Sequence, residues 1–280
     1  GNHNTAEFWE YDTRLGRRWN IEPLINKYPD LSSYSVFTNN PILYADPDGK
    51  DWTIKTTSDN NGNQTVQIKL TAAVLNTSSN KAINMRDFAN ALKNQVQTSY
   101  SIKYTKTIYE PLTKKSGLDN YPSETIMVPR EVVVTVNVSV DVRVINKQSE
   151  LKSNEHLVII QDSKNLPGLY GKANKIGETI VNVGDKFVPN MLNCKDNNTL
   201  PHELGHTLGL QHIDQKSETF MGWFGGNPQY MTPANQKKNA TNAMFSGDSP
   251  YMNDKTSTGI TGSQIEIGKK AAAARDINKH

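Results

Sequence analysis

Hydrophobic and polar residues alternate along one stretch in the middle of the chain. Seven valines occupy every second position there, and mostly polar residues separate them: Val132, Val134, Val136, Val138, Val140, Val142 and Val144. A period of two is typical of a β-strand, because successive side chains point to opposite faces of a sheet. The pattern predicts a strand over residues 132–144 with one buried face.

A helical period appears before this strand. Apolar residues recur at intervals of three and four, at Met85, Phe88, Ala89, Leu92, Val96 and Tyr100. This spacing places them on one side of an α-helix, so we expect an amphipathic helix over residues 84–102. Further upstream, residues 51–55 and 65–70 flank the turn-forming residues 60–63, which predicts a β-hairpin. Its second arm is expected to continue to Leu75.

The remaining elements are shorter. Residues 156–161 and 177–183 are apolar runs that predict two further strands. A last helix is expected to begin at Thr261, because Thr261 and Gln264 have the spacing of a capping box. One strand pair, a helix, more strands and then helices form the order of an α+β domain, with a sheet packed on two main helices.

Composition narrows the classes of partner. The chain of 280 residues carries 31 basic and 28 acidic side chains, a formal net charge of +3, which argues against nucleic acid or an anionic membrane as the main partner. No apolar run approaches the roughly 18 residues of a membrane span. The single cysteine, Cys194, excludes disulfides within the chain and cysteine-rich zinc sites. We expect it to be a small, partly buried residue rather than one that blocks a metal site.

The strongest chemical signal is the sequence H-E-x-x-H-x-x-G-x-x-H at positions 202–212. Residues four apart on a helix lie on one face, so His202 and His206 can direct two imidazoles at one ion. Gly209 permits a positive φ angle, which lets the chain leave the helix and bring His212 back as a third ligand. Three imidazoles with one open position are typical of catalytic zinc, and Glu203 is placed to act as a general base. Asn198 or Thr199 is the expected N-cap of this helix, and Pro201 is tolerated in its first turn.

This motif resembles the zinc signature of the metzincin metallopeptidases. The resemblance implies a metzincin-like mixed sheet with mostly antiparallel edges, an active-site helix, a C-terminal helix and a substrate cleft along an edge strand. The strand expected at 177–183 matches the place of that edge strand. The residue after the third histidine often identifies the metzincin subfamily. Here it is Ile213, which matches none of the large subfamilies.

Metzincins also carry a methionine in a tight turn beneath the zinc. Met244 best matches the spacing to the last helix, Met221 is the alternative, and Met252 is a remote third. Some metzincins place a tyrosine two residues after this methionine, where it is an extra zinc ligand. The residues at that distance from Met244 and Met221 are Ser246 and Trp223, so no such ligand is expected here. Aromatic residues of the intervening stretch either line the pocket for the residue after the scissile bond or pack the lower part of the domain; they are Phe220, Trp223, Phe224 and Tyr230.

The first fifty residues have a different character. They contain, in order, Tyr-Asp, Arg-Leu-Gly-Arg, Pro-Leu, Tyr-Pro, Asn-Asn-Pro and Asp-Pro-Asp-Gly. This succession resembles the C-terminal end of the repeat core of Rhs proteins over residues 7–50. The resemblance implies a boundary at the Asp-Pro-Asp-Gly motif, followed by a toxin domain over 51–280. It also implies self-cleavage through Asp46 and Asp48, although Lys50 stands where many relatives have an apolar residue; the motif is equally interpretable as a β-turn.

Together the two resemblances imply a zinc endopeptidase that forms the C-terminal toxin domain of an Rhs-type polymorphic toxin. It is expected to be secreted, or delivered into target cells, as part of that larger secreted toxin. The expected cofactor is Zn²⁺, and the expected partners are a protein substrate in the target cell, a cognate immunity protein and the Rhs shell of the parent chain. Neither a nucleic-acid partner nor a membrane span is expected. The alternatives are a toxin of another class, such as a nuclease or another zinc hydrolase, and a binding module that zinc only stabilises.

Overall fold

The chain divides into two compact units, residues 1–49 and 50–280. The computed structural model describes residues 52–114, 124–216 and 229–274, together with three short strands of the first unit. Those strands, β1 (His3–Ala6), β2 (Trp9–Asp12) and β3 (Arg17–Arg18), form an antiparallel sheet. Asp46 and Asp48 lie outside the described residues.

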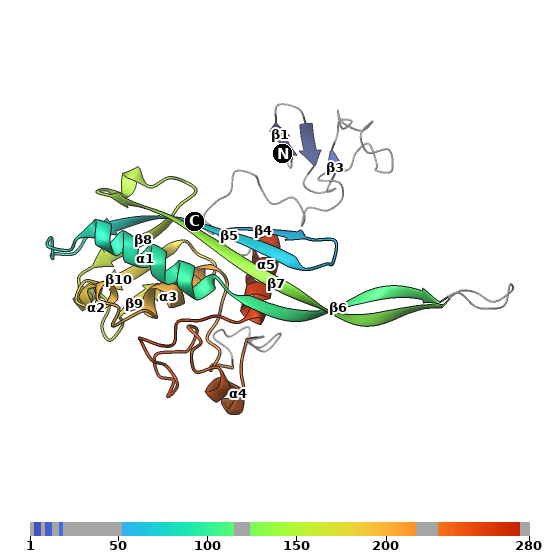
Figure 1. Ribbon diagram of the computed structural model, residues 1–280. Helices are drawn as coiled ribbons and strands as arrows, with labels where there is room; N and C mark the ends of the chain where they lie inside the picture. The colour runs from blue at the N-terminus through green and yellow to red at the C-terminus, as the bar shows by residue number, and fades with distance from the viewer. Residues whose placement is uncertain are drawn as a thin grey trace. The chain divides into compact units, whose positions relative to one another are not determined.

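A seven-stranded mixed sheet forms the framework of the second unit (Figure 1). Its order is β6-β7-β5-β8-β10-β9, and β4 pairs with the first half of β5. The inner pairs, β7 with β5, β5 with β8 and β8 with β10, are parallel, whereas the pairs made by the outer strands β6, β4 and β9 are antiparallel. The bounds are β4 (Trp52–Ser58), β5 (Gln64–Asn76), β6 (Lys103–Lys114), β7 (Glu124–Ile145), β8 (His156–Gln161), β9 (Gly171–Ala173) and β10 (Ile180–Gly184).

The expected hairpin and central strands are confirmed. Strands β4 and β5 form the hairpin, with Trp52 opposite Leu70, and Gly62 adopts a φ of +70° in the turn. The second arm continues to Asn76 because its later half pairs with β7 on one side and β8 on the other. Strand β8 has the expected bounds, and β7 contains the alternating valines but begins eight residues before them.

Two strands were missed, and one of them changes the edge of the sheet. Strand β10 begins three residues later than expected, and it is not an edge strand, because β9 pairs with it on the side away from β8. Strand β9 has the sequence Gly-Lys-Ala, which is too short to show a period. The other missed strand is β6, the partner of β7.

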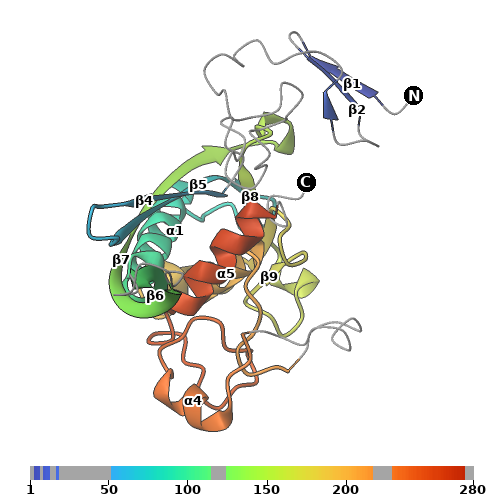
Figure 2. The same ribbon diagram turned by 90° about the vertical axis from the view of Figure 1, so that its right-hand side faces the viewer.

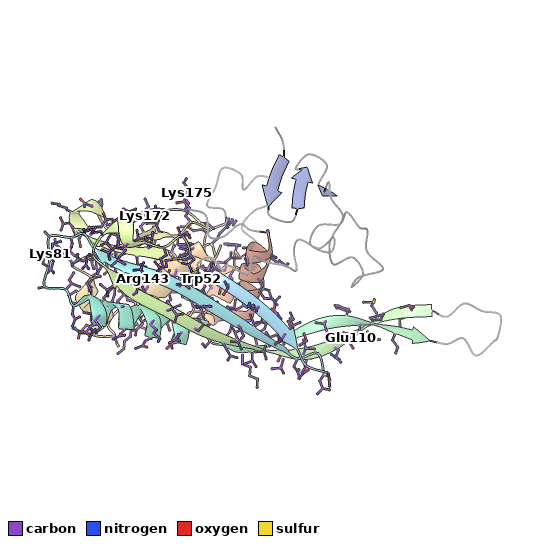
Figure 3. The ribbon with its side chains drawn as sticks, turned by 90° about the horizontal axis from the view of Figure 1, so that it is seen from above. Trp52, Lys81, Glu110, Arg143, Lys172 and Lys175 are labelled. Carbon is purple, nitrogen blue, oxygen red and sulfur yellow. The ribbon has the colours of Figure 1, made fainter. Side chains whose placement is uncertain are left out.

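The outer parts of β6 and β7 form a two-stranded arm that projects from the rest of the unit; Glu110 marks it in Figure 3. Large apolar side chains on this arm are exposed, with Tyr109 at 64% and Met127 at 57% of their full accessibility. Hydrogen-bonded and non-hydrogen-bonded pairs alternate in an antiparallel ladder. Val136 and Ile102 form a hydrogen-bonded pair in this register. Pro129 on β7 and Pro111 on β6 each lie an odd number of residues from that pair, so both belong to non-hydrogen-bonded pairs. Their nitrogens therefore face outward, and both edges of the arm lack a donor at those positions.

Helix α1 (Met85–Tyr100) packs against β7 and β5 inside the curl of the sheet, as Figure 2 shows. The expected helix is confirmed, and the Asn84 side chain caps it by accepting hydrogen bonds from two backbone N–H groups. Phe88, Leu92, Val96 and Tyr100 on its apolar side are completely buried, and Met85 at its start is partly buried. These residues form the main core with the inner face of the sheet and the later helices.

The later helices are short except for the last. They are α2 (Val188–Leu192), α3 (Thr199–Thr207), α4 (Pro233–Lys238) and α5 (Gly262–Ala273), with single 3-10 turns at Gln148–Glu150 and Ser163–Asn165. The predicted capping box of the last helix is present, with Thr261 and Gln264 bonded reciprocally. None of the helices in the described ranges is long and apolar enough to cross a membrane.

Candidate metal centre

Helix α3 carries the first half of the histidine motif, and all nine of its residues are buried. Asn198 is the N-cap of this helix, one of the two expected positions, but its side chain makes no capping bond to it. Asp196 does so, because one of its carboxylate oxygens accepts the N–H groups of Asn198 and Thr199, each at 3.0 Å. The carboxylate also complements the positive end of the helix dipole.

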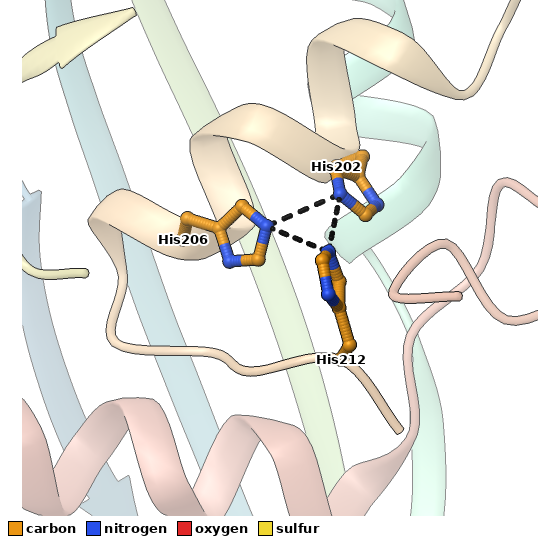
Figure 4. Close-up of side chains that lie close together, drawn as sticks. All are labelled: His202, His206 and His212. Atoms are coloured by element: carbon orange, nitrogen blue, oxygen red, sulfur yellow. Dashed lines mark hydrogen bonds between the residues drawn. The ribbon is translucent and has the colours of Figure 1, made fainter. Parts of the chain in front are cut away.

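The helix ends at Thr207, and its C-cap, Leu208, immediately precedes the glycine of the motif. Gly209 has a φ of +86°, in the left-handed region that glycine adopts readily, as the sequence predicted. The chain then turns back and places His212 beside the two helical histidines (Figure 4). Two ligands from a helix and one from the following loop therefore meet at one point.

The three imidazoles converge through the same ring atom. The Nε2 atoms of His202, His206 and His212 are separated by 3.1, 3.1 and 3.2 Å (Figure 4). A tetrahedral zinc ion with Zn–N distances of 2.0–2.1 Å separates its nitrogen ligands by about 3.3 Å. The triangle of Nε2 atoms therefore has nearly the size that zinc requires.

The opposite ring nitrogen of each histidine faces an oxygen. Nδ1 of His202 lies 2.7 Å from the Ala243 carbonyl, and Nδ1 of His206 lies 2.8 Å from the Leu210 carbonyl. Nδ1 of His212 lies 3.0 Å from Oε1 of Gln215. These oxygens can only accept, so each Nδ1 carries the proton and each Nε2 presents a lone pair to the other two.

The electrostatics of the triad favour a cation. Burial, together with the neighbouring His202 imidazole, lowers the pKa of His206 to about 4, so this ring is neutral at pH 7. Three lone pairs about 3 Å apart repel one another, and a metal ion at their centre removes that repulsion. The residues present therefore fit a bound zinc ion, with at most three protein ligands from this group and one position open.

Glu203 is placed beside the metal position but outside the triad. Its side chain is buried, and its Oε2 accepts the N–H of Ala173, on strand β9, at 2.6 Å. Burial raises the pKa of the Glu203 carboxyl above its ordinary value, although His206 and the Ala173 N–H act in the opposite direction. A carboxylate with a raised pKa is better able to take a proton from water near neutral pH.

Strand β9 approaches this helix closely because its first residue is glycine. A Cβ atom on Gly171 would lie 2.8 Å from Cγ2 of Thr199 and 3.0 Å from Cγ of Glu203. The first separation is shorter than real carbon–carbon contacts and the second is tighter than most, so a side chain at this position would displace the strand or these two side chains. A sign of this contact in the sequence is the pair of small residues, Gly171 and Ala173, on either side of Lys172. The sequence shows no alternation of apolar and polar residues there that would predict the strand.

Met244 lies directly beneath the histidine helix. It is completely buried, and a Cβ atom on Gly205 would lie 2.5 Å from its Sδ. Its carbonyl accepts the N–H of Ile213, at 2.9 Å, which joins the Met244 segment to the loop of the third histidine. The Tyr100 hydroxyl closes the same region by donating to the Pro201 carbonyl at 2.8 Å.

The other residues considered from the sequence have more varied positions. Met252 is half-buried against the main core, and Tyr230 lies under the ammonium of Lys216. Cys194 is exposed, contrary to the expected partial burial, and it is not part of the histidine group. Met221, Phe220, Trp223 and Phe224 lie outside the described residues.

Comparisons of the chain with protein-family models, with curated proteins and with solved structures found no match. The assignment therefore depends on the geometry of the site. A buried histidine triad that can hold a metal ion, with an adjacent glutamate, is consistent with a metallohydrolase.

Proposed function

We propose that the unit formed by residues 50–280 is a zinc endopeptidase. The observation that carries this proposal is the convergence of three Nε2 atoms next to a glutamate that is bonded to the edge of the sheet. His202, His206 and His212 would hold the zinc ion. When bound, the ion lowers the pKa of a coordinated water and polarises a substrate carbonyl.

The chain's own residues supply the proton transfers. One oxygen of Glu203 is held by the Ala173 N–H, which fixes the carboxylate and leaves its other oxygen to accept the proton of the attacking water. The same carboxyl then gives the proton to the leaving amine. Because the glutamate is enclosed by α3 and β9, its orientation is fixed before substrate arrives.

The sheet edge explains a preference for polypeptide. On its side away from β10, strand β9 pairs with no other described strand. Glu203 takes the outward N–H of Ala173, and we propose that the other outward backbone groups of β9 pair with an extended chain. A peptide that adds to this edge as a further strand passes the Ala173–Glu203 contact. This arrangement supports an endopeptidase over a hydrolase of small molecules.

The same features favour a metzincin-type enzyme. The glycine turn after α3, the antiparallel edge strand and the buried methionine all agree with the resemblance of the histidine motif. We assign the methionine turn beneath the zinc to Met244, because it packs against Gly205 and its carbonyl binds the loop of His212.

The catalytic proposal is tested by replacing Glu203 with Gln. We expect the variant to bind zinc and to lose cleavage of an unfolded protein substrate such as casein, because the amide cannot take the proton of the water. Glu131→Gln, an exposed position on β7, is the matched control and should retain activity. Full proteolysis by the Glu203 variant, or a folded wild type that takes up no zinc, contradicts the proposal.

We further propose that this peptidase is the delivered toxin of a larger secreted Rhs-type protein. The ordered motifs of the first fifty residues, ending in Asp-Pro-Asp-Gly, support this proposal. A protease acting in a target cell endangers its producer, so we expect a cognate immunity protein that covers the cleft. Expression of residues 50–280 should be toxic, and co-expression of the neighbouring open reading frame should restore growth. Equal growth of cells expressing the wild type and the Glu203→Gln variant would count against a toxin.

A further inference from the structure

The third histidine differs from the other two in how it is held. His202 and His206 project from a buried helix, and their Nδ1 atoms bond to backbone carbonyls. His212 projects from a loop and is only partly buried, and its Nδ1 partner is the side chain of Gln215. The orientation of this ligand therefore depends on a residue that substitution can change.

The backbone of the loop is fixed independently of that glutamine. The N–H of Ile213 donates to Met244, and its carbonyl accepts the N–H of Met231 at 2.7 Å. Asp214 accepts the N–H of Ser246 at 2.9 Å and its hydroxyl at 2.5 Å. These bonds place the Cα of His212, but none of them prevents its imidazole from rotating about the side-chain bonds.

We propose that Gln215 is the positioning residue that orients His212 toward the metal. This inference rests on the zinc site of the proposed function and identifies a residue outside its histidine–glutamate motif. Gln215 Oε1 accepts the proton on Nδ1, which holds the ring plane and keeps the lone pair on Nε2. Gln215 does not touch the substrate or the zinc ion; it acts through the histidine.

The expected size of the effect follows from the role. Loss of an outer partner of a zinc-bound histidine commonly lowers metal affinity by about 10–100-fold. His202 and His206 would keep their carbonyl partners, so the site should weaken rather than disappear. A glutamate at this position would still accept from Nδ1, and its charge should make His212 a better donor to the metal.

The test compares four proteins: wild type, Gln215→Leu, Gln215→Asn and Gln215→Glu. Leucine has a similar size but no acceptor, and asparagine keeps the amide but is one carbon too short to reach. We expect about 10–100-fold weaker zinc binding for leucine and asparagine, measured by competition with a chromogenic chelator, and affinity at or above the wild-type value for glutamate. Lys216→Ala is the matched control in the same loop and should leave zinc affinity unchanged.

A spectroscopic measurement separates orientation from general damage to the fold. With Co²⁺ as the probe, the leucine and asparagine variants should show altered visible absorption, while thermal unfolding of their metal-free forms matches the wild type. Wild-type zinc affinity in both variants overturns the positioning role, provided that His212→Ala abolishes tight binding. If wild type and His212→Ala bind zinc equally weakly, the metal site itself is refuted, and this inference with it.

Discussion

Gly205 lies where the histidine helix, the buried methionine and helix α1 come closest together. A Cβ atom added there would lie 2.5 Å from Sδ of Met244 and 2.9 Å from the hydroxyl oxygen of Tyr100. Both neighbours are completely buried, and the hydroxyl is bonded to the Pro201 carbonyl. Neither side chain can move into solvent, so Gly205→Ala should force a rearrangement of the core beneath the zinc site.

Two opposing terms set the size of the effect. Insertion of a methyl group into a packed core costs about 1–3 kcal/mol of unfolding free energy. Alanine in place of glycine inside a helix contributes about 1 kcal/mol in the opposite direction. Because the added Cβ would lie closer than 3.0 Å to two buried side chains, the steric cost should be at the upper end of its range, about 2–3 kcal/mol. We therefore expect the variant to be less stable by about 1–2 kcal/mol, which lowers the midpoint of thermal unfolding by about 2–8 °C in a unit of this size.

The assay is thermal and chemical denaturation of the metal-free protein, with zinc affinity measured in parallel. Gly268→Ala in α5 is the matched control, because the nearest atom to its added Cβ would be the Leu208 Cγ at 3.1 Å. There the smaller steric cost should be offset by the gain in helix propensity, leaving stability within about 0.5 kcal/mol of the wild type. Wild-type or higher stability of Gly205→Ala would refute the close packing of Met244 against this helix.

Three further predictions concern other parts of the unit. Replacement of Pro111 and Pro129 by Thr restores outward N–H groups on both edges of the arm, so light scattering should detect more self-association than in the wild type. Glu155 is buried, and burial raises its carboxyl pKa, but the hydrogen bonds and charges of Arg143 and Lys152 together outweigh burial and leave the pKa below 4.5. Because the pKa of the folded state is lowered, the carboxylate stabilises the fold above pH 4.5, and this contribution is lost as the pH falls through the lowered pKa. Glu155→Gln should therefore lose less unfolding free energy on acidification than the wild type does. The same dependence of unfolding free energy on acidic pH in both proteins would argue against this ion pair. Removal of zinc by a chelator should abolish proteolysis while circular dichroism retains the native spectrum, because the main core lies between the sheet and α1; complete unfolding would instead favour a module that zinc only stabilises.

The parts of the fold that the sequence predicts are those with a local pattern. The valine alternation, the apolar side of α1 and the capping box at Thr261 each involve neighbouring residues and one physical rule. The histidine motif belongs to this class too, because helix geometry and one positive φ bring its ligands together. In these segments tertiary packing agrees with the local preference and changes only the ends.

Contacts between distant segments were not predictable in the same way. The carbonyl that orients His202 belongs to Ala243, and any residue type supplies a carbonyl, so no sequence signal marks it. Asn198 is the N-cap of α3, as expected, but the side chain that accepts the first N–H groups is that of Asp196, two residues earlier. Strand β9 was missed because three residues are too few for a period, and its position at the edge follows only from its pairing with β10.

Three glycines show why the motif identifies the ligands but does not by itself build the site. Gly209 belongs to the motif, and its positive φ is a local requirement that could be deduced from spacing. Gly205 and Gly171 are needed for a different reason: each permits another segment to approach α3, the methionine turn in one case and the edge strand in the other. A chain with the same histidines but larger residues at these two positions would still have the metal ligands. A larger residue at position 171 would displace either β9 or the Thr199 and Glu203 side chains, which should weaken the bond between the Ala173 N–H and the carboxylate. The proposed hydrolytic site therefore depends on close approach between segments distant in the sequence, in addition to the spacing of the histidines.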